Sequence, residues 1–187
     1  MNFNDKVTRS VIQVKETNEF FGALMLFSEF IKSETVPTAA TDGRKVYINE
    51  NFFNSLNASE QNGLLLHEVL HMALLHVPRM GSREQKRWNI AADYVVNDLI
   101  IRNSNFSLPK GAIKSLKEEY WDKSVEYIYE KIPNSMISKF SNVDLIPIMD
   151  EIAEKDAGKS KHQNIPQHKI FFGCFHKIFP DLLQCLL

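Results

Sequence analysis

The stretch LLLHEVLHMALLH at residues 64–76 constrains this chain most, because it places ionisable side chains inside an almost continuous apolar run. It contains the pattern H-E-x-x-H, in which His67 and His71 are four residues apart. On a helix of about 3.6 residues per turn, these two imidazoles share one face, where one ion can bind both. Glu68 lies about 100° further round, where it can reach a water on that ion without being a ligand. These are the parts of a zinc hydrolase.

Both ends of this helix can be predicted. Asn57 is a candidate N-cap, and Glu60 three residues later completes a capping-box pair. Pro78 follows the last apolar residues, so the pattern predicts a helix over residues 58–77. Apolar side chains cover nearly its whole circumference, so we expect it to be central and buried. Burying unpaired ionisable groups costs several kcal/mol, which a bound metal offsets. The alternative is that these groups are hydrogen-bonded members of an ordinary core.

A second helix is predicted over residues 83–102, and a polar stripe at spacing four runs through its apolar surface: Asn89, Asp93 and Asn97. Asp93 follows His71 at a distance that lets the first helix end and the second return alongside it. Its carboxylate can then complete a set of two histidines and one acid with an open fourth position. Asn89 or Asn97 can orient Asp93. The alternative for Asp93 is a buried cap or a salt-bridge partner.

Three other residues compete for places at this site. Asp98 lies about 100° off the polar stripe, and Glu84 lies in the exposed first turn, so both rank below Asp93 as a third ligand. His76 lies about 140° round the helix from His71 and misses the three-histidine spacing, whose last position here is Val77. We therefore expect His76 to be structural or to support a ligand.

The other elements follow from the same patterns. Asp42-Gly43 predicts a two-residue type I′ hairpin turn, with Val46 and Ile48 facing the core and Tyr47 facing away. The hairpin either offers its edge to an extended peptide or merely covers the core. The expected elements are helices over 4–16, 18–32, 125–132 and 143–154, the hairpin over 37–49, a helical turn over 51–56 and a turn over 78–82.

Composition excludes several classes of function. The 187 residues fit one domain with a tail, and a net charge of −1 gives no electrostatic reason to bind nucleic acid or an anionic membrane. We find no signal peptide and no apolar run long enough to span a membrane. The two cysteines, Cys174 and Cys185, suggest no disulfide framework. We expect a cytoplasmic protein.

The C-terminal part of the chain changes character. Residues 155–164 are polar and predict a linker, whereas residues 165–187 are rich in aromatic side chains. This tail packs loosely, binds a protein partner, or is the remnant of a truncated region. A second zinc site there matches no spacing template; its members would be His162, His168, Cys174 and His176.

The motifs together resemble a known family, the metallopeptidase-type domain of bacteria and phages that usually precedes a von Willebrand A-like domain. The tail stands here where that second domain would follow. The resemblance implies a mainly helical α+β, minimal zincin-like fold with a small sheet beside the H-E-x-x-H helix. It also implies one zinc ion per chain, held by His67, His71 and Asp93, with Glu68 as the base. The matching segments cover roughly residues 15–132 and are NEFFGALM, TDGRKVYIN, LLHEVLHMALLH, RWNIAADYVVND and LP…YWDKSVEYIYEKI.

We therefore expect a zincin-like domain at residues 1–133, a helical extension at 134–154, and a linker and tail at 155–187. The leading hypothesis is hydrolysis of a peptide or protein substrate by a zinc-activated water, with Glu68 as general base. Tyr94 and His76 are both candidates to stabilise the oxyanion. The alternatives are a zinc-stabilised binding module without turnover and an inactive truncated remnant.

Overall fold

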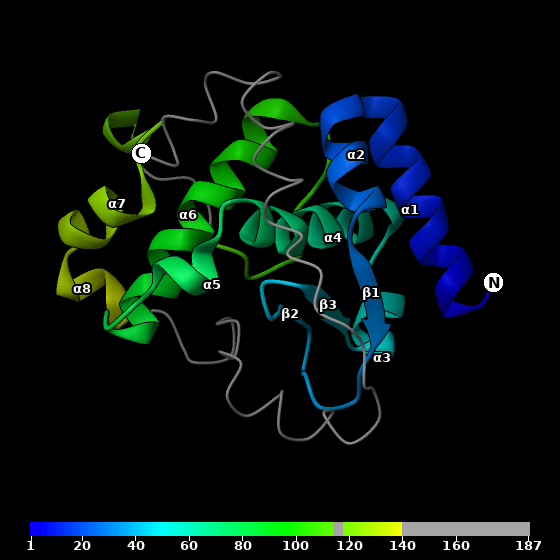
Figure 1. Ribbon diagram of the computed structural model, residues 1–187, viewed down its shortest axis with the longest axis horizontal. Coiled ribbons are helices and arrows are strands. Elements are labelled where there is room, and N and C mark those ends of the chain that lie inside the picture. Colours follow the sequence, from blue (N-terminus) through cyan, green and yellow to red (C-terminus); the bar gives the residue numbers. More distant parts are fainter. Residues whose placement is uncertain (114–117, 140–187) are drawn as a thin grey trace.

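The computed structural model describes residues 1–113 and 118–139, in which a small three-stranded sheet packs beside the helices (Figure 1). This confirms the mainly helical α+β class. The expected helix at 143–154, the linker at 155–164 and the tail at 165–187 lie outside the described residues, and the domain boundaries stay predictions. The elements are α1 (Phe3–Thr17), α2 (Glu19–Leu26), β1 (Glu29–Lys32), β2 (Ala39–Thr41), β3 (Lys45–Ile48), α3 (Glu50–Ser55), α4 (Ala58–Ala73), α5 (His76–Arg79), α6 (Gln85–Asn103), a 3-10 turn (Glu118–Tyr120), α7 (Val125–Lys131) and α8 (Asn134–Ile137).

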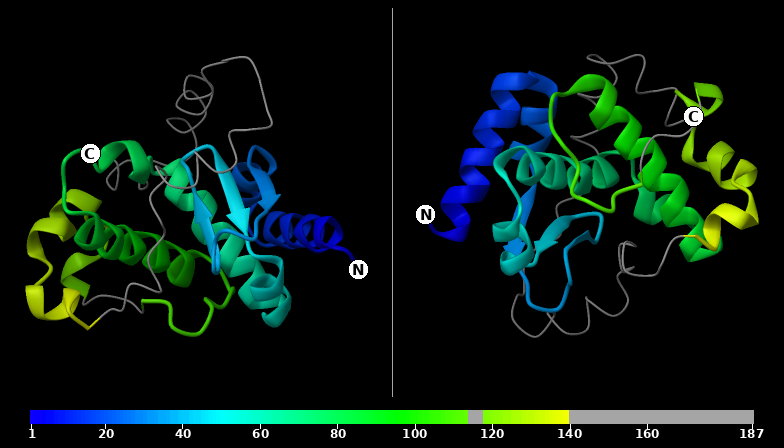
Figure 2. Two further views of the ribbon diagram at one scale, coloured as in Figure 1. Left: turned by 90° about the horizontal axis from the view of Figure 1, so that it is seen from below. Right: turned by 180° about the vertical axis from the view of Figure 1, so that it is seen from behind.

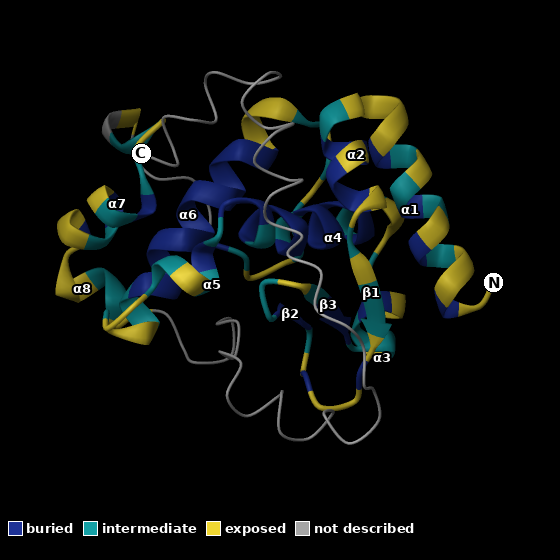
Figure 3. Ribbon diagram, in the orientation of Figure 1, coloured by how far each residue is buried: buried dark blue, intermediate teal, exposed yellow. Residues whose placement is uncertain are grey.

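Helix α4 lies at the centre, with α1 and α2 on one side, the sheet on another and α6 alongside it (Figures 1 and 2). Its start is the predicted capping box. The Asn57 side chain accepts from the Glu60 N–H at 3.0 Å, and the Glu60 carboxylate accepts from the Asn57 N–H at 3.1 Å. Among the described helices α4 and α6 are the most buried, whereas α1, α3, α7 and α8 each have exposed residues (Figure 3).

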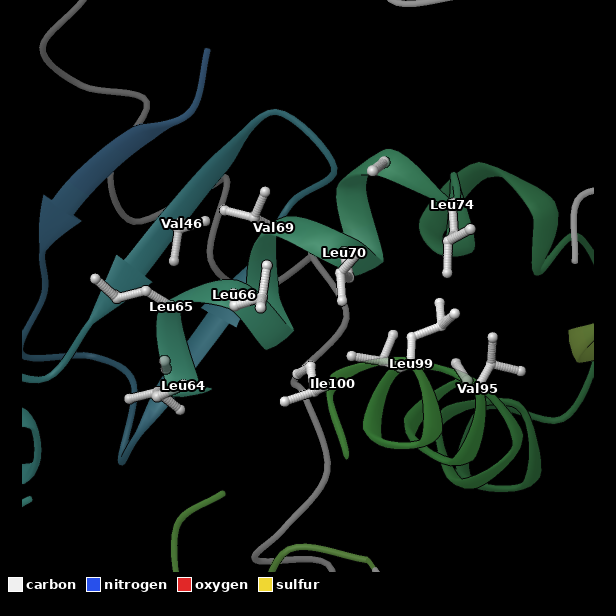
Figure 4. Close-up of a cluster of buried hydrophobic side chains, with 14 of the residues drawn as sticks. Val46, Leu64, Leu65, Leu66, Val69, Leu70, Leu74, Val95, Leu99 and Ile100 are labelled. Carbon is white, nitrogen blue, oxygen red and sulfur yellow. The ribbon is translucent and has the colours of Figure 1, made fainter. Parts of the chain in front are cut away.

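The core is built from apolar side chains on several faces of α4. In Figure 4 its leucines extend toward Val46 of β3 in one direction and toward Ile100 of α6 in another. Leu65, Leu66 and Leu70 are fully buried. Burying a leucine side chain stabilises a fold by about 1.5–3 kcal/mol, so this packing fixes α4 firmly between its neighbours. The predicted central, buried helix is confirmed.

The end of α4 differs from the prediction. The helix stops at Ala73, because Leu75 adopts a left-handed conformation with φ of 57°. Pro78 lies inside the short helix α5 that follows and does not end α4. Proline is tolerated in the first turn of a helix, where its missing N–H has no partner to lose. The break turns the chain at Leu75, so His76 starts a new element.

The predicted helix over residues 18–32 is wrong beyond Leu26. Residues 29–32 form β1, which runs parallel to β3 and pairs Phe30 with Val46 and Ile31 with Tyr47. The helix-like spacing of the aromatic residues misled the prediction, and Phe27 is 71% exposed. A sheet partner distant in sequence decided the structure of this segment, as is common for strands.

The hairpin forms, but its turn is shifted by one residue. The Asp42 N–H donates to the Lys45 carbonyl at 3.3 Å, which makes Gly43 and Arg44 the central residues. Only Gly43 has positive φ, at 80°, so the type I′ turn at Asp42-Gly43 is wrong. The Asp42 carboxylate accepts from the N–H groups of Arg44 and Lys45, both at 2.6 Å. Aspartate favours this position just before a turn for that reason.

The two faces of the hairpin have different environments. Val46 and Ile48 are fully buried in the main core, as predicted. Tyr47 faces away from that core and packs with Val36 and Ala40 in a smaller cluster. Strand β2 stands at one end of the strand order β1-β3-β2.

Helix α6 returns alongside α4 and covers the predicted range closely. Its N-cap is Glu84, whose carboxylate accepts from the N–H groups of Lys86 and Arg87 at 2.9 and 2.8 Å. Glu84 is therefore occupied as a cap.

Among the described residues, no helix is long and apolar enough to cross a membrane.

Candidate metal centre

Three side chains from two helices direct their ligand atoms to one point. Helix α4 presents His67 and His71, and α6 presents Asp93. The two Nε2 atoms are 2.9 Å apart, and the Asp93 Oδ1 lies 3.3 Å from Nε2 of His71 and 3.6 Å from Nε2 of His67. Within the described part of the chain, these residues form a group able to hold a metal ion.

The spacing of the three atoms fits a tetrahedral metal site. Zinc bonds to nitrogen and oxygen of about 2.0–2.2 Å place neighbouring ligand atoms about 3.3–3.6 Å apart. The three observed separations, 2.9, 3.3 and 3.6 Å, lie close to this range. Two imidazole nitrogens and one carboxylate oxygen are also a donor set used by catalytic zinc sites. The residues therefore fit the metal that the motif implies.

The hydrogen bonds of Asn97 fix the protonation of His67. The amide nitrogen of Asn97 donates to the backbone carbonyl of Ile113 at 2.7 Å, and that carbonyl can only accept. The amide oxygen therefore faces Nδ1 of His67, at 2.8 Å, and that nitrogen carries the proton. The lone pair of Nε2 is left for a metal. Asn97 thus orients His67, a contact that the sequence analysis did not assign to it.

Burial keeps both histidines in the form that binds metal. Desolvation lowers the pKa of His67 to about 4, with the neighbouring His71 as a second cause, and it lowers the pKa of His71 to about 3. Both rings are therefore neutral at pH 7. Their contacts with Asp93 are accordingly not ion pairs between a cation and an anion.

Glu68 lies in the same buried region but is not one of the three ligands. It is 2% exposed. Burial, and after it the charge of Asp93, raise its pKa to about 8. Glu68 and Asp93 therefore interact electrostatically, and the negative charge of one disfavours ionisation of the other. A bound cation acts in the opposite direction and favours the ionised carboxylate.

His76 lies behind His71. The Nδ1 atoms of the two rings are 3.1 Å apart, and the rings are nearly perpendicular, with an interplanar angle of 73°. The expectation that His76 lies about 140° away assumed a continuous helix, and the break at Leu75 removes that premise. The carbonyl of His76 accepts from the indole N–H of Trp88 at 2.9 Å.

A small cavity adjoins His71. Its volume of about 20 Å³ is enough for roughly one water molecule. Strand β2 borders it through Thr41, so the hairpin reaches the candidate site. The lining residues are Thr41, His71, His76, Val77, Trp88, Asn89 and Ala92.

Tyr94 and Asp98 do not line the cavity beside His71. Both line a separate cavity of about 10 Å³ together with Trp121, and Arg102 donates to the Asp98 carboxylate at 3.1 Å. The structure brings the ligand atoms of His67, His71 and Asp93 together. Asn97 contacts the far side of the His67 ring, and His76 contacts the far side of the His71 ring. It leaves the other candidates, Glu84, Tyr94 and Asp98, away from the three ligand atoms.

Two residues at this site, Ile113 and Trp88, were missed by sequence reasoning. The carbonyl of Ile113 carries no side-chain signal, because any residue in that loop offers the same group. Trp88 was counted as an apolar residue, and its indole N–H could have indicated a buried acceptor nearby.

Comparison with known proteins agrees with this geometry. No curated protein and no solved structure matches the chain. One family model, described as "Putative metallopeptidase domain", matches residues 2–170, a range that includes α4, α6 and all three candidate ligands. The chain belongs to that family.

Proposed function

We propose that this protein is a zinc-dependent peptidase that holds one zinc ion through His67, His71 and Asp93. The observation that carries the proposal is the convergence of two Nε2 atoms and one carboxylate oxygen within 3.6 Å of one another, from two packed helices. Membership of a metallopeptidase-type family supports the same reading.

The donor set favours zinc over the hard cations. Calcium and magnesium prefer sites made wholly of oxygen ligands, whereas imidazole suits zinc and other transition metals. The three ligands leave a fourth position for water or substrate. Asn97 supports this choice, because it holds His67 in the tautomer that offers Nε2.

In this reaction a bound zinc supplies Lewis acidity, which polarises the scissile carbonyl and the attacking water. Glu68 accepts the proton of that water and passes it to the leaving amine. A bound cation favours the ionised form of this carboxylate, which is the form that accepts a proton, and the burial that raises its pKa favours the protonated form, which is the form that donates one. Strand β2 stands at the end of the strand order and borders the cavity beside His71, which supports an extended peptide as the substrate.

Replacement of the base tests this proposal. Glu68→Gln should bind zinc as the wild type does and lose at least about a hundredfold in peptide hydrolysis, the usual contribution of a general base. The matched control is Glu130→Gln, the same change at an exposed position of α7, which should leave both properties unchanged. The two readouts are zinc content and cleavage of a mixed peptide library. Unchanged hydrolysis by the Glu68 variant would rule out its assignment as the base.

One observation favours a second function, a zinc-stabilised binding module without turnover. His71, Glu68 and Asp93 are each less than 5% exposed, so the centre is closed to large groups in this structure. X-ray absorption spectroscopy separates the two functions. A fourth ligand supplied by water supports the peptidase, whereas four protein ligands support the binding module.

A further inference from the structure

The contact between His71 and His76 joins two nitrogens of the same kind. Their Nδ1 atoms are 3.1 Å apart, and both residues are 2% exposed. A hydrogen bond at this distance requires one ring to donate and the other to accept. The direction of that bond decides which nitrogen of His71 can bind a metal.

The geometry around His71 indicates the direction in the metal-bound protein. Its Nε2 faces Nε2 of His67 and the carboxylate of Asp93, so Nε2 is the atom that a metal at this centre would meet. That nitrogen must then be unprotonated, and the single ring proton lies on Nδ1. With a metal on Nε2, the Nδ1–H of His71 would donate to Nδ1 of His76, and His76 would carry its own proton on Nε2.

The surroundings of His76 hold it in place as an acceptor. The left-handed residue Leu75 turns the chain back, and the indole N–H of Trp88 binds the His76 carbonyl at 2.9 Å. Arg79 of the same short helix donates to the Leu74 carbonyl at 3.0 Å, which fastens α5 to the end of α4. The cavity of about 20 Å³ beside the ring has room for a water that accepts the Nε2–H.

We propose that His76 is a positioning residue, which accepts the Nδ1–H of His71 and holds His71 as an Nε2 ligand of the metal. It completes a symmetrical arrangement, because Asn97 performs the same task for His67. Partners that bind the second nitrogen of a ligating histidine typically contribute 10–100-fold in metal affinity. The inference rests on the proposed function only in that the centre binds zinc, and it assigns His76 no part in oxyanion stabilisation.

Two substitutions separate the acceptor from simple packing. In His76→Asn the side-chain oxygen replaces Nδ1 as an acceptor, whereas His76→Leu keeps an apolar body of similar size and offers none. We expect zinc affinity, measured with the full-length chain in competition with a chelating dye, to fall about 10–100-fold in the leucine variant and much less in the asparagine variant. Equal affinities in all three proteins, or equal losses in both variants, would overturn the proposal.

Nitrogen-15 NMR of the zinc-loaded wild type provides a second readout that needs no variant to fold. The proposal predicts a proton on Nδ1 of His71 and on Nε2 of His76, and the opposite placement would overturn it. Failure of the proposed function remains distinguishable. Zinc binding with the predicted tautomers but no peptide hydrolysis would refute the peptidase alone, whereas a folded wild type that binds no zinc would refute both.

Discussion

At the scale of the residue, the candidate centre is defined by how burial changes protonation. The folded chain excludes protons from His67 and His71, whose pKa values fall to about 4 and about 3 from 6.5. It retains a proton on Glu68, whose pKa rises to about 8 from 4.5. The metal-free centre is therefore close to neutral at pH 7 apart from Asp93. A divalent cation can enter without competing against protons on the histidines.

These shifts predict how the stability of the metal-free protein depends on pH. Between pH 4.5 and 6.5 the unfolded chain binds two protons, on His67 and His71, that the folded chain excludes, and these outweigh the one Glu68 proton that only the folded chain keeps, so stability rises with pH. Between pH 6.5 and 8 the folded chain alone keeps the Glu68 proton, so its contribution to stability falls as pH rises. Urea unfolding of chelator-treated protein should show that Glu68→Gln removes the fall between pH 6.5 and 8. An identical fall in wild type and variant would contradict the assignment.

At the scale of the element, the break between α4 and α5 places His76. The start of α4 could be predicted from the sequence, because the residues of a capping box are specific and Asn57 and Glu60 form one. The end of α4 could not be predicted, because the left-handed residue that ends a helix is usually glycine or asparagine and here it is Leu75. Spacing alone predicted that His67, His71 and Asp93 could meet, since it fixes which residues share a helix face. It could not predict strand β1, whose partner β3 lies more than ten residues away.

The backbone at position 75 offers a test of this break. Leu75→Gly should keep the left-handed turn, because glycine adopts positive φ without steric cost. Leu75→Val should be less stable than the glycine variant by at least about 1 kcal/mol, because a β-branched residue is a genuine outlier there. The valine variant should also bind zinc more weakly, since His76 can no longer lie behind His71.

The two measurements for this pair are urea unfolding and dye competition for zinc. Glycine loses more side-chain packing than valine, so a glycine variant that is nevertheless the more stable of the two identifies the backbone conformation as the cause. Equal stability and equal zinc affinity in the two variants would show that the left-handed turn does not position His76.

At the scale of the whole molecule, the centre depends on the loop that follows α6 and packs against the start of α4. The loop after α6 returns to α4, where the Ser107 N–H donates to the Ser59 hydroxyl at 2.9 Å. A methyl group at Gly63 would lie 2.1 Å from the Ser107 carbonyl oxygen, so α4 and this loop approach as closely as glycine permits. The same loop continues to Ile113, whose carbonyl holds Asn97. Packing at the start of α4 is thus linked to the orientation of His67.

This link predicts different effects for two glycine substitutions. Gly63→Ala should displace the loop, destabilise the fold by about 1–3 kcal/mol and weaken zinc binding through Asn97. Gly22→Ala is the matched control, because its added methyl group would lie 2.4 Å from the backbone of Lys15, in a contact between α1 and α2. It should lower the melting temperature without changing zinc affinity in the folded protein. Equal zinc affinity for both variants would contradict the link.

The most direct test of the central claim is the zinc content of purified, folded protein, with Asp93→Ala beside the wild type. We predict about one zinc per wild-type chain and a marked loss in the variant, because Asp93 is the only carboxylate proposed among the three ligands. Circular dichroism of both proteins controls for folding. A folded wild type without zinc would contradict the metal centre, and His67 and His71 would then be ordinary members of a buried core.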